Sequence, residues 1–283
     1  MSTLTSKITD CPTCASIART DTLASITTRF ASSDRKCGAC GNNCGKPSLL
    51  DLFSGGGGAA RGYQRAGFCV LGVDLEAQPR YIGCRFLQAD ALEYLAKHSQ
   101  EYDAIHASPP CQAYTSLRKM WNSRQHPNLV APTWERLKTT GVPWVMENVL
   151  GAPFCAPIIL CGSMFRLGCE GAELRRHRLF ETSFPLMSPS ACVHGWSGKA
   201  AETIGVYGHA GGYSLRQRYA TIGVYGRHGR DRRRRKNGQH FSTARRAEAM
   251  GIDWMTGAEL SQAIPPAYTT WIGRMLLQEL AQK

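Results

Sequence analysis

The chain of 283 residues lacks an apolar run of about 18 residues, the length that a helix needs to cross a membrane. Its N-terminus also lacks a basic segment followed by an apolar one, so we expect no secretory leader. Acidic residues are scarce: 21 Asp and Glu stand against 34 Lys and Arg, which gives a formal net charge of +13. We therefore expect no membrane partner and a cytoplasmic protein.

Disulfides are also not expected, although the chain has twelve cysteines. A disulfide framework suits small secreted proteins, so reduced thiols, metal ligands or a nucleophile are the remaining interpretations. The N-terminal residues 1–46 hold two Cys-x2-Cys pairs, a zinc-binding pattern, with Cys44 as an alternative ligand. The predicted zinc ligands are Cys11, Cys14, Cys37 and Cys40. A tail with reduced thiols is the other interpretation. A second candidate set of ligands is Cys161, Cys169, Cys192 and His194.

From residue 48 onward, apolar runs of strand length alternate with segments of helix length. This alternation predicts βαβ units and a parallel sheet. The expected strands are 48–53, 68–74, 86–90, 103–108 and 143–149. Ligands of such sheets bind at the carboxyl ends of the strands. The residues at or near those ends that are candidates for ligand binding or catalysis are Ser54, Asp74, Asp90, Cys111 and Glu147.

After about residue 184 the alternation stops and a basic segment follows. The sequence TIGVYG occurs at residues 203 and 221, and each copy predicts a short strand that ends at glycine. Residues 216–246 hold eleven Arg or Lys and one acid, Asp231, a net charge of +10. Such a block typically meets the phosphates of nucleic acid, and a solvated loop is its plainer interpretation. Two helices are expected beyond it, at 242–252 and 268–282.

Four consecutive glycines, Gly55–Gly58, separate the first expected strand from the first helix. Glycine lets a ligand approach the backbone closely, but no Gly-Lys-Ser/Thr follows, which excludes a P-loop. Asp74 lies where a ribose-binding acid is expected, and Asp90 is placed to accept from an adenine amine. A dinucleotide or an adenosine-containing methyl donor would fit this pattern, while a loop cap or helix cap is the plainer interpretation of each acid.

The stretch HASPPCQAYTS, residues 106–116, places a thiol directly after two prolines. A Pro-Pro step fixes the backbone, so Cys111 is a candidate nucleophile provided that its neighbours lower its pKa. An inert buried cysteine is the alternative. Glu147 lies in the apolar stretch PWVMENV, where burial would raise its pKa and allow it to donate a proton. A rigid thiol and a buried acid at two strand ends together favour catalysis.

In their order along the chain, these motifs resemble the DNA cytosine-C5 methyltransferases. DLFSGGGG is similar to the donor-binding loop of that family, PPCQ to its nucleophile motif and ENV to its glutamate motif. RRHR, residues 175–178, resembles the arginine motif, and AIPPAYTTWIG resembles the C-terminal motif that returns to the donor pocket. The resemblance covers about 48–182 and 241–279.

The resemblance implies an α/β fold with a Rossmann-like sheet of the S-adenosylmethionine-dependent methyltransferases. A small target-recognition region of strands and loops and a Cys-rich N-terminal extension would be attached to it. The implied segments are the extension at 1–46, a catalytic domain at 47–182, a basic target-recognition region at 183–240 and a return to the catalytic domain at 241–283.

The implied activity is methyl transfer from S-adenosylmethionine to C5 of a cytosine flipped out of double-stranded DNA. Cys111 would bond to C6 of the base and Glu147 would hydrogen-bond to or protonate N3. Arg176 and Arg178 would steady the base and the local phosphate, although a surface ion pair is the plainer interpretation of these arginines. The loop 113–125 would close over the base. We expect a monomer, with S-adenosylmethionine as donor and a structural zinc.

The implied donor contacts follow the same motifs. Asp74 would bind the ribose, Leu75 would pack on adenine and Asp90 would accept from the adenine amine. The full set of donor-binding residues is Asp51, Phe53, Ser54, Gly55, Gly56, Gly57, Asp74, Leu75, Asp90, Ala91, Pro109, Gln262 and Ile264. The sequence departs from the family at Ser261-Gln262, where Gly-Asn is usual, and at Leu174, where Gln is usual.

Three other functions stay open. An amino-methyltransferase acting on cytosine N4 or adenine N6 also uses a Pro-Pro turn, but normally with an aromatic residue where Cys111 stands. A tRNA cytosine-C5 methyltransferase shares every catalytic motif. A non-catalytic zinc and nucleic-acid-binding protein would be expected to lose its catalytic residues first, and Cys111, Glu147 and the arginine pair are all present.

Overall fold

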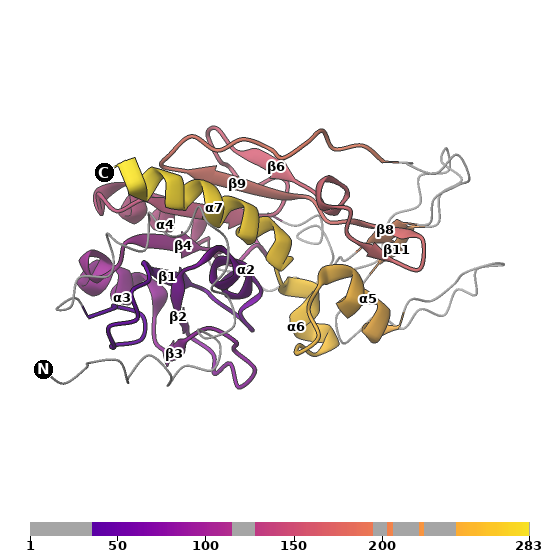
Figure 1. The fold of residues 1–283 in the computed structure, drawn as a ribbon. Coiled ribbons are helices and arrows are strands. Elements are labelled where there is room, and N and C mark those ends of the chain that lie inside the picture. The colour runs from indigo at the N-terminus through magenta and orange to yellow at the C-terminus, as the bar shows by residue number, and fades with distance from the viewer. Residues whose placement is uncertain (1–35, 115–127, 195–202, 206–220, 224–241, 283) are drawn as a thin grey trace, which may run out of the picture.

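The computed structural model describes residues 36–114, 128–194, 203–205, 221–223 and 242–282 (Figure 1). Within these ranges, no helix is both long enough and apolar enough to span a membrane.

A seven-stranded sheet with the order β3-β2-β1-β4-β5-β9-β6 forms the centre of the molecule. Its strands are β1 (Ser48–Leu52), β2 (Cys69–Asp74), β3 (Arg85–Gln88), β4 (Ala104–Ala107), β5 (Trp144–Asn148), β6 (Ile158–Leu160) and β9 (Arg178–Thr182). β1 to β5 pair in parallel, and β9 runs antiparallel to both β5 and β6. The predicted Rossmann-like α/β sheet is confirmed, and its strand order reverses between β1 and β4.

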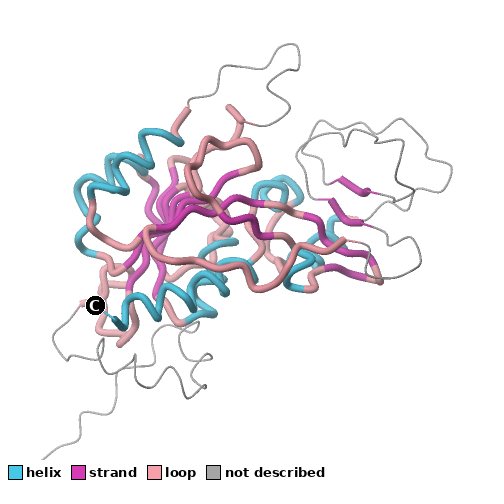
Figure 2. Tube along the Cα trace, turned by 90° about the horizontal axis from the view of Figure 1, so that it is seen from above, coloured by secondary structure: helices cyan, strands magenta, loops and turns pink. Residues whose placement is uncertain are grey.

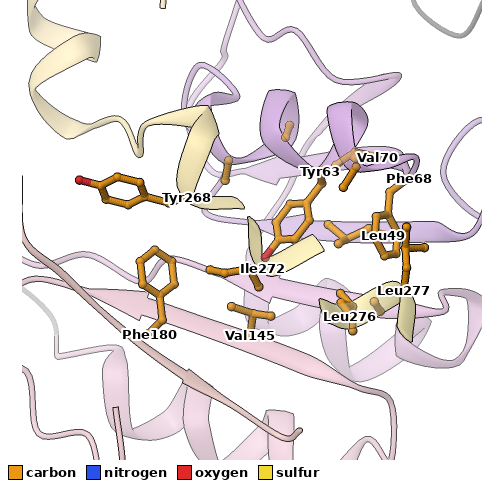
Figure 3. Packing of buried hydrophobic residues seen from close by; sticks show 14 of the residues in the cluster. Leu49, Tyr63, Phe68, Val70, Val145, Phe180, Tyr268, Ile272, Leu276 and Leu277 are labelled. Atoms are coloured by element: carbon orange, nitrogen blue, oxygen red, sulfur yellow. The ribbon is translucent and has the colours of Figure 1, made fainter. Parts of the chain in front are cut away.

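Helices cover both faces of this sheet, as Figure 2 shows. They are α2 (Gly58–Ala66) and α7 (Pro266–Gln282) on one face, and α3 (Ala91–His98) and α4 (Val130–Thr139) on the other, with the short η1 (Ser99–Glu101) after α3. Side chains of β1 alternate between the faces: Leu49 packs with α2 and α7, whereas Leu50 and Leu52 pack with α3 and α4. A parallel strand covered on both faces is buried on both, which explains why β1 is apolar except at Ser48 and Asp51. Figure 3 shows the packing of Leu49 with Tyr63 and Ile272.

The helices α2 and α7 approach closely because α2 carries glycines at the contact. A Cβ atom on Gly62 would lie 1.9 Å from Thr269 Oγ1, and one on Gly58 would lie 2.5 Å from Ile264 O. Thr269 Oγ1 donates a hydrogen bond to Ala59 O at 2.9 Å. The C-terminal helix therefore packs directly on the helix that follows the glycine loop (Figure 1).

A second sheet of four short strands has the order β11-β10-β8-β7. Its strands are β7 (Gly168–Cys169), β8 (Ala172–Arg175), β10 (Thr203–Gly205) and β11 (Thr221–Gly223), and η3 (Gly162–Phe165) precedes them. The predicted pair of repeat strands is confirmed: β10 and β11 pair in parallel with Thr203 opposite Thr221. α5 (Thr243–Met250) packs on β7 and β8, and α6 (Gly257–Gln262) follows it (Figure 1). β7 and β8 come from the segment 47–182, and the four segment boundaries stay a prediction.

Candidate active site

The loop between β1 and α2 turns at residues with positive φ: Phe53 at 57°, Gly55 at 49° and Gly57 at 82°. Glycine adopts such angles without strain, which explains why the turn is rich in glycine. The indole Nε1–H of Trp254 donates to Gly56 O at 2.8 Å. A residue that precedes the AIPPAYTTWIG motif thus contacts this loop, and the return of the motif itself to a donor pocket stays a prediction.

Asp74 ends β2 beside the glycine loop. Its Oδ2 accepts the N–H of Gly55 at 2.9 Å, and its Oδ1 accepts the N–H of Glu76 at 3.0 Å. The next residue, Leu75, is 66% exposed. An acid and an exposed apolar side chain therefore lie together at the carboxyl end of β2, an arrangement that fits the ribose and adenine of a donor.

Asp90 is the N-cap of α3, as the plainer interpretation predicted. Its Oδ1 accepts the N–H of Leu92 at 2.9 Å and that of Glu93 at 2.8 Å. The residue is exposed at the carboxyl edge of the sheet, while Ala91 behind it is buried. A contact of Asp90 with adenine stays a prediction.

Asp51 lies in β1 beneath the glycine loop and is 1% exposed. Among the described residues, neither of its carboxylate oxygens has a hydrogen-bond partner, and the buried hydroxyl of Ser54 has none either. Burial raises the pKa of Asp51 well above its usual range, and the charge of Asp74 raises it further. Unpaired buried polar groups are rare and costly, so Asp51 and Ser54 are candidates for contact with a bound ligand.

Cys111 follows β4 on the Pro109-Pro110 turn. The side chain of Asn148, at the end of β5, donates from Nδ2 to Pro109 O at 2.9 Å. The N–H of Tyr114 donates to Cys111 O at 2.9 Å. These two bonds hold the turn on either side of the thiol. Asn148 belongs to the ENV motif, but the sequence did not predict this role for it.

Glu147 and Arg178 form a buried ion pair across β5 and β9, with 2.9 Å between Oε1 and Nε. Arg176 is fully buried, and its Nη2 donates to Ser261 O at 2.9 Å and to Ala263 O at 2.6 Å. The arginine motif is therefore bound to the C-terminal motif inside the protein. The alternative of a surface ion pair was wrong for both arginines.

The four predicted catalytic residues act on one another electrostatically, which places them in one site. Burial raises the pKa of Cys111, and Arg178 and Arg176 offset only part of this effect. Burial also raises the pKa of Glu147 against the effect of the same two arginines. Burial and Arg178 lower the pKa of Arg176 to about 9. A raised pKa suits Glu147 as a proton donor. The condition that neighbours lower the pKa of the thiol is not met, because burial outweighs them.

A buried chain of polar side chains, which the sequence did not predict, supports Glu147. The ring of His106, in β4, is fully buried, and burial lowers its pKa to about 3, so the ring is neutral. Its Nδ1 lies 2.9 Å from the hydroxyl of Tyr63, and its Nε2 lies 2.8 Å from the hydroxyl of Ser108. Ser108 in turn hydrogen-bonds Glu147.

The ionisation state of Glu147 determines which group donates in each of these hydrogen bonds. In the ionised form, which pairs with Arg178, the carboxylate of Glu147 only accepts, so Ser108 donates to it. His106 then donates its Nε2–H to Ser108 and accepts the O–H of Tyr63 at Nδ1. This series of hydrogen bonds from Tyr63 to Ser108 therefore positions the carboxyl group of Glu147 from the α2 side of the sheet. The only sequence signal was one polar residue in an otherwise apolar strand.

The two C-terminal donor candidates lie in different surroundings. Gln262 is exposed at the end of α6, whereas the side chain of Ile264 is buried in the core beside α2. Pro109 is buried at the nucleophile turn. Arg80, after β2, forms a two-pronged ion pair with Glu259 of α6, with 2.9 Å between Nε and Oε2. This ion pair joins α6 to the segment that follows β2.

Two groups of described residues are arranged like metal ligands. The first is Cys37, Cys40, Cys44 and Cys69, and the second is Cys161, His177, Cys192 and His194; within each group the ligand atoms lie within 4.8 Å of one another. Cys69, the first residue of β2, and His177, inside the RRHR motif, were missed as ligands. Cys169, which the sequence suggested, packs instead in the core beneath α5.

The first group is built on a tight turn. The N–H of Gly41 donates to Cys37 O at 2.8 Å, and the N–H of Cys37 donates to Asn42 O at 3.0 Å. Cys11 and Cys14 lie outside the described residues, so their role as ligands stays a prediction. The four gathered sulfurs are sufficient for one tetrahedral ion without them.

Two further predicted segments also lie largely outside the described residues: the closing loop, from residue 115 onward, and most of the basic segment 216–246. The residues that flank the former segment are joined, because the hydroxyl of Tyr114 donates to Asn128 Oδ1.

No family model matches the sequence, and no curated protein matches it. The S. pombe Dnmt2 methyltransferase matches with a TM-score of 0.52 and 13% identity, over 83% of this chain and 99% of that one. The SAM-dependent methyltransferase from Agrobacterium tumefaciens matches with a TM-score of 0.23 and 17% identity, over 44% of this chain and 42% of its own. Human methyltransferase-like protein 13 in complex with SAH matches with a TM-score of 0.28 and 14% identity, over 55% and 78%. The first likeness shows the fold: this chain has the architecture of the Dnmt2 methyltransferase.

Proposed function

We propose that this protein is an S-adenosylmethionine-dependent methyltransferase that acts on C5 of cytosine in double-stranded DNA. The observation that carries the proposal is the shared site of Cys111, Glu147, Arg176 and Arg178 at the carboxyl edge of the sheet. A thiol fixed on a proline turn beside a buried acid and two arginines matches the needs of addition to a pyrimidine ring.

The donor would lie over the carboxyl ends of β1, β2 and β3, where ligands of such sheets bind. Asp74 and Leu75 would hold its ribose and adenine. Asp51 and Ser54, whose buried oxygens lack partners among the described residues, support a ligand with polar groups above them. When bound, S-adenosylmethionine supplies an electrophilic methyl group. The Trp254 contact and the Arg80–Glu259 pair would hold the wall of this site in place.

The protein groups would activate the base as follows. The sulfur of Cys111 forms a bond to C6, and the electron pair of the C5–C6 double bond moves into the ring as Glu147 hydrogen-bonds to or protonates N3. C5 is then nucleophilic and takes the methyl group, while the electron pair of the broken carbon–sulfur bond stays on the donor sulfur, which leaves as a thioether. The C5 proton passes to water, the electron pair of the C5–H bond re-forms the C5–C6 double bond, and the thiolate of Cys111 departs, which restores the aromatic ring. Arg178 stabilises the thiolate and Arg176 holds the arginine turn in the core.

Deprotonation of the thiol belongs to the bound state. Because burial raises the pKa of Cys111, the thiol is protonated in the free protein at neutral pH. A flipped cytosine held over the site would place its C6 atom next to the sulfur of Cys111. Loss of the thiol proton would then lead to bond formation only when the target cytosine is in place.

We also infer a structural zinc at Cys37, Cys40, Cys44 and Cys69. It would fasten the N-terminal segment to the start of β2, so that it stabilises the fold and takes no part in the chemistry.

The test is incubation with tritiated donor and with duplex DNA or tRNA, followed by nucleoside analysis. We expect 5-methylcytosine in the DNA, and a denaturation-resistant adduct with duplexes that contain 5-fluorocytosine. Cys111→Ala should abolish both, whereas the exposed Cys155→Ser serves as the matched control and should retain both. Methylation of tRNA alone, or a product methylated on N4 or N6, would contradict the proposal.

A further inference from the structure

Four potential ligand atoms converge next to the arginine turn. The Nε2 atoms of His177 and His194 lie 3.2 Å apart. The sulfur of Cys192 lies 3.3 Å from the first of these nitrogens and 3.0 Å from the second. The sulfur of Cys161 lies 4.0 Å from His194 Nε2. The group combines two thiols and two imidazoles around one point.

These separations match those of a tetrahedral ion. Zinc binds sulfur at about 2.3 Å and nitrogen at about 2.0–2.1 Å, so two nitrogens in a tetrahedron lie about 3.4 Å apart, and a nitrogen and a sulfur about 3.6 Å apart. The observed range of 3.0–4.0 Å brackets both values. Two thiolates and two imidazoles form one of the common ligand sets of structural zinc.

An acid behind the site orients one of the histidines. His194 Nδ1 lies 3.2 Å from Glu173 Oε1, in β8. A neutral imidazole that donates its Nδ1–H to a carboxylate presents a lone pair at Nε2, which is the atom that faces the other three ligands. A carboxylate bonded to the outer nitrogen of a histidine is a recurrent second partner of zinc ligands. The hydroxyl of Ser163 also lies 3.6 Å from the sulfur of Cys192.

The four ligands come from three parts of the chain. Cys161 precedes η3, His177 lies in the turn between β8 and β9, and Cys192 and His194 lie in the segment that precedes β10. The carbonyl of His177 accepts a hydrogen bond from Arg178 Nη1 at 2.9 Å. An ion at this point would therefore fasten the turn that carries Arg176 and Arg178 to the segment that leads to the basic repeat.

We propose that Cys161, His177, Cys192 and His194 bind a second structural zinc ion, which positions the arginine turn and anchors the segment leading to the basic region. The ion has a full set of protein ligands and no open position, so its role is structural. Its four ligands act on the proposed catalysis only through Arg176 and Arg178, and they are positioning residues.

The test is zinc analysis of the purified full-length protein and of matched variants. We expect Cys192→Ser to lose one equivalent of zinc relative to the unchanged protein, and the exposed Cys155→Ser to lose none. Cys40→Ser should remove the ion of the first group and retain this one. In the Cys40→Ser protein, cobalt should then show the absorption of a tetrahedral ion with thiolate ligands, and Cys192→Ser should abolish it. Thermal unfolding establishes that each variant is folded.

A second variant distinguishes a bound zinc ion from a group of side chains that are held together only by hydrogen bonds. Glu173→Gln leaves the four ligands intact but weakens the bond to His194, and loss of such a partner lowers zinc affinity by about 10–100-fold. Competition with a chromophoric chelator measures this change. A folded Cys192→Ser protein with undiminished zinc would overturn the proposal, as would a disulfide between Cys161 and Cys192. Zinc is counted without any methyl transfer, so failure of the proposed activity leaves this result readable.

Discussion

Cys111 experiences opposing electrostatic effects, and their balance determines when it reacts. Burial disfavours the thiolate, whereas the guanidinium groups of Arg178 and Arg176 favour it. Because burial dominates, the free protein protects the thiol, and the arginines limit how far the pKa rises.

This balance predicts the effect of Arg178→Ala. The positive charge of Arg178 lowers the pKa of Cys111, so its removal should raise that pKa further. The rate of alkylation by iodoacetamide follows the thiolate fraction, and its midpoint should move to higher pH. At pH 8 the variant should react more slowly than the unchanged protein, as mass spectrometry of the peptide that contains Cys111 would measure.

Arg175→Ala is the matched control for this experiment. Arg175 is next to the same turn but is not among the groups that principally set the pKa of Cys111. In Arg175→Ala, the pH midpoint for alkylation of Cys111 should stay close to that of the unchanged protein. An unchanged or lower midpoint in Arg178→Ala would contradict the assigned role of that arginine.

Single residues also show what a sequence pattern leaves open. The apolar strand around Glu147 correctly predicted a buried acid with a raised pKa, because burial follows from the neighbouring side chains. The same reasoning did not reveal Tyr63, His106 and Ser108, because their hydrogen bonds join α2, β4 and the turn after β4. Partners so far apart in the chain leave no periodic signal.

The packing of α2 on α7 depends on close approach of their backbones. Gly62 lies against Thr269 and the carbonyl of Pro266, and a Cβ atom there would lie 2.2 Å from that backbone oxygen. Since α2 follows the glycine loop directly, this packing also determines where the loop lies.

We therefore expect Gly62→Ala to destabilise the protein. Overpacking of this kind costs about 1–3 kcal/mol, and a contact with backbone atoms is harder to relieve than one with a flexible side chain. The urea midpoint of unfolding should fall. Gly257→Ala in α6 is the control, because its added Cβ would meet Thr243 at 3.4 Å, an ordinary contact.

Alanine reduces the conformational freedom of the unfolded chain relative to glycine. The free energy of unfolding of Gly257→Ala should therefore stay the same or rise by about 0.4–1 kcal/mol. Equal destabilisation by Gly257→Ala and Gly62→Ala would contradict the packing argument.

At the scale of the whole molecule, charge is concentrated in one segment. The basic segment 216–246 accounts for most of the net charge of +13. It includes β11, which joins the second sheet, and that sheet begins with β7 and β8 close to the arginine motif. The basic segment is therefore attached to the candidate active site through the second sheet.

Replacement of Arg232–Arg235 by glutamine should weaken DNA binding at every sequence. Removal of one phosphate-binding cation reduces the dependence of log K on log salt by about 0.9, so removal of four would lower the slope by up to about 3.6. Fluorescence anisotropy over a series of salt concentrations measures both affinity and slope.

Lys97→Gln is the control for charge alone. Lys97 lies in the last turn of α3, at the edge of the sheet opposite the carboxyl ends of the strands. Lys97→Gln should change neither the affinity for DNA nor the slope of its salt dependence. If the arginine variant loses affinity for one sequence only, these arginines read bases and do not act through phosphates.

The sequence by itself determined the alternation of strands and helices, the parallel sheet, the paired repeat strands and the residue types at the strand ends. Each of these follows from local patterns of apolar residues, glycine and proline. The tertiary structure alone decided that Cys69 joins Cys37 and that His177 joins Cys161. It also decided that burial outweighs the arginines at Cys111. Metal geometry and pKa depend on distance and solvent exclusion in space, which residues far apart in the chain acquire only when it folds.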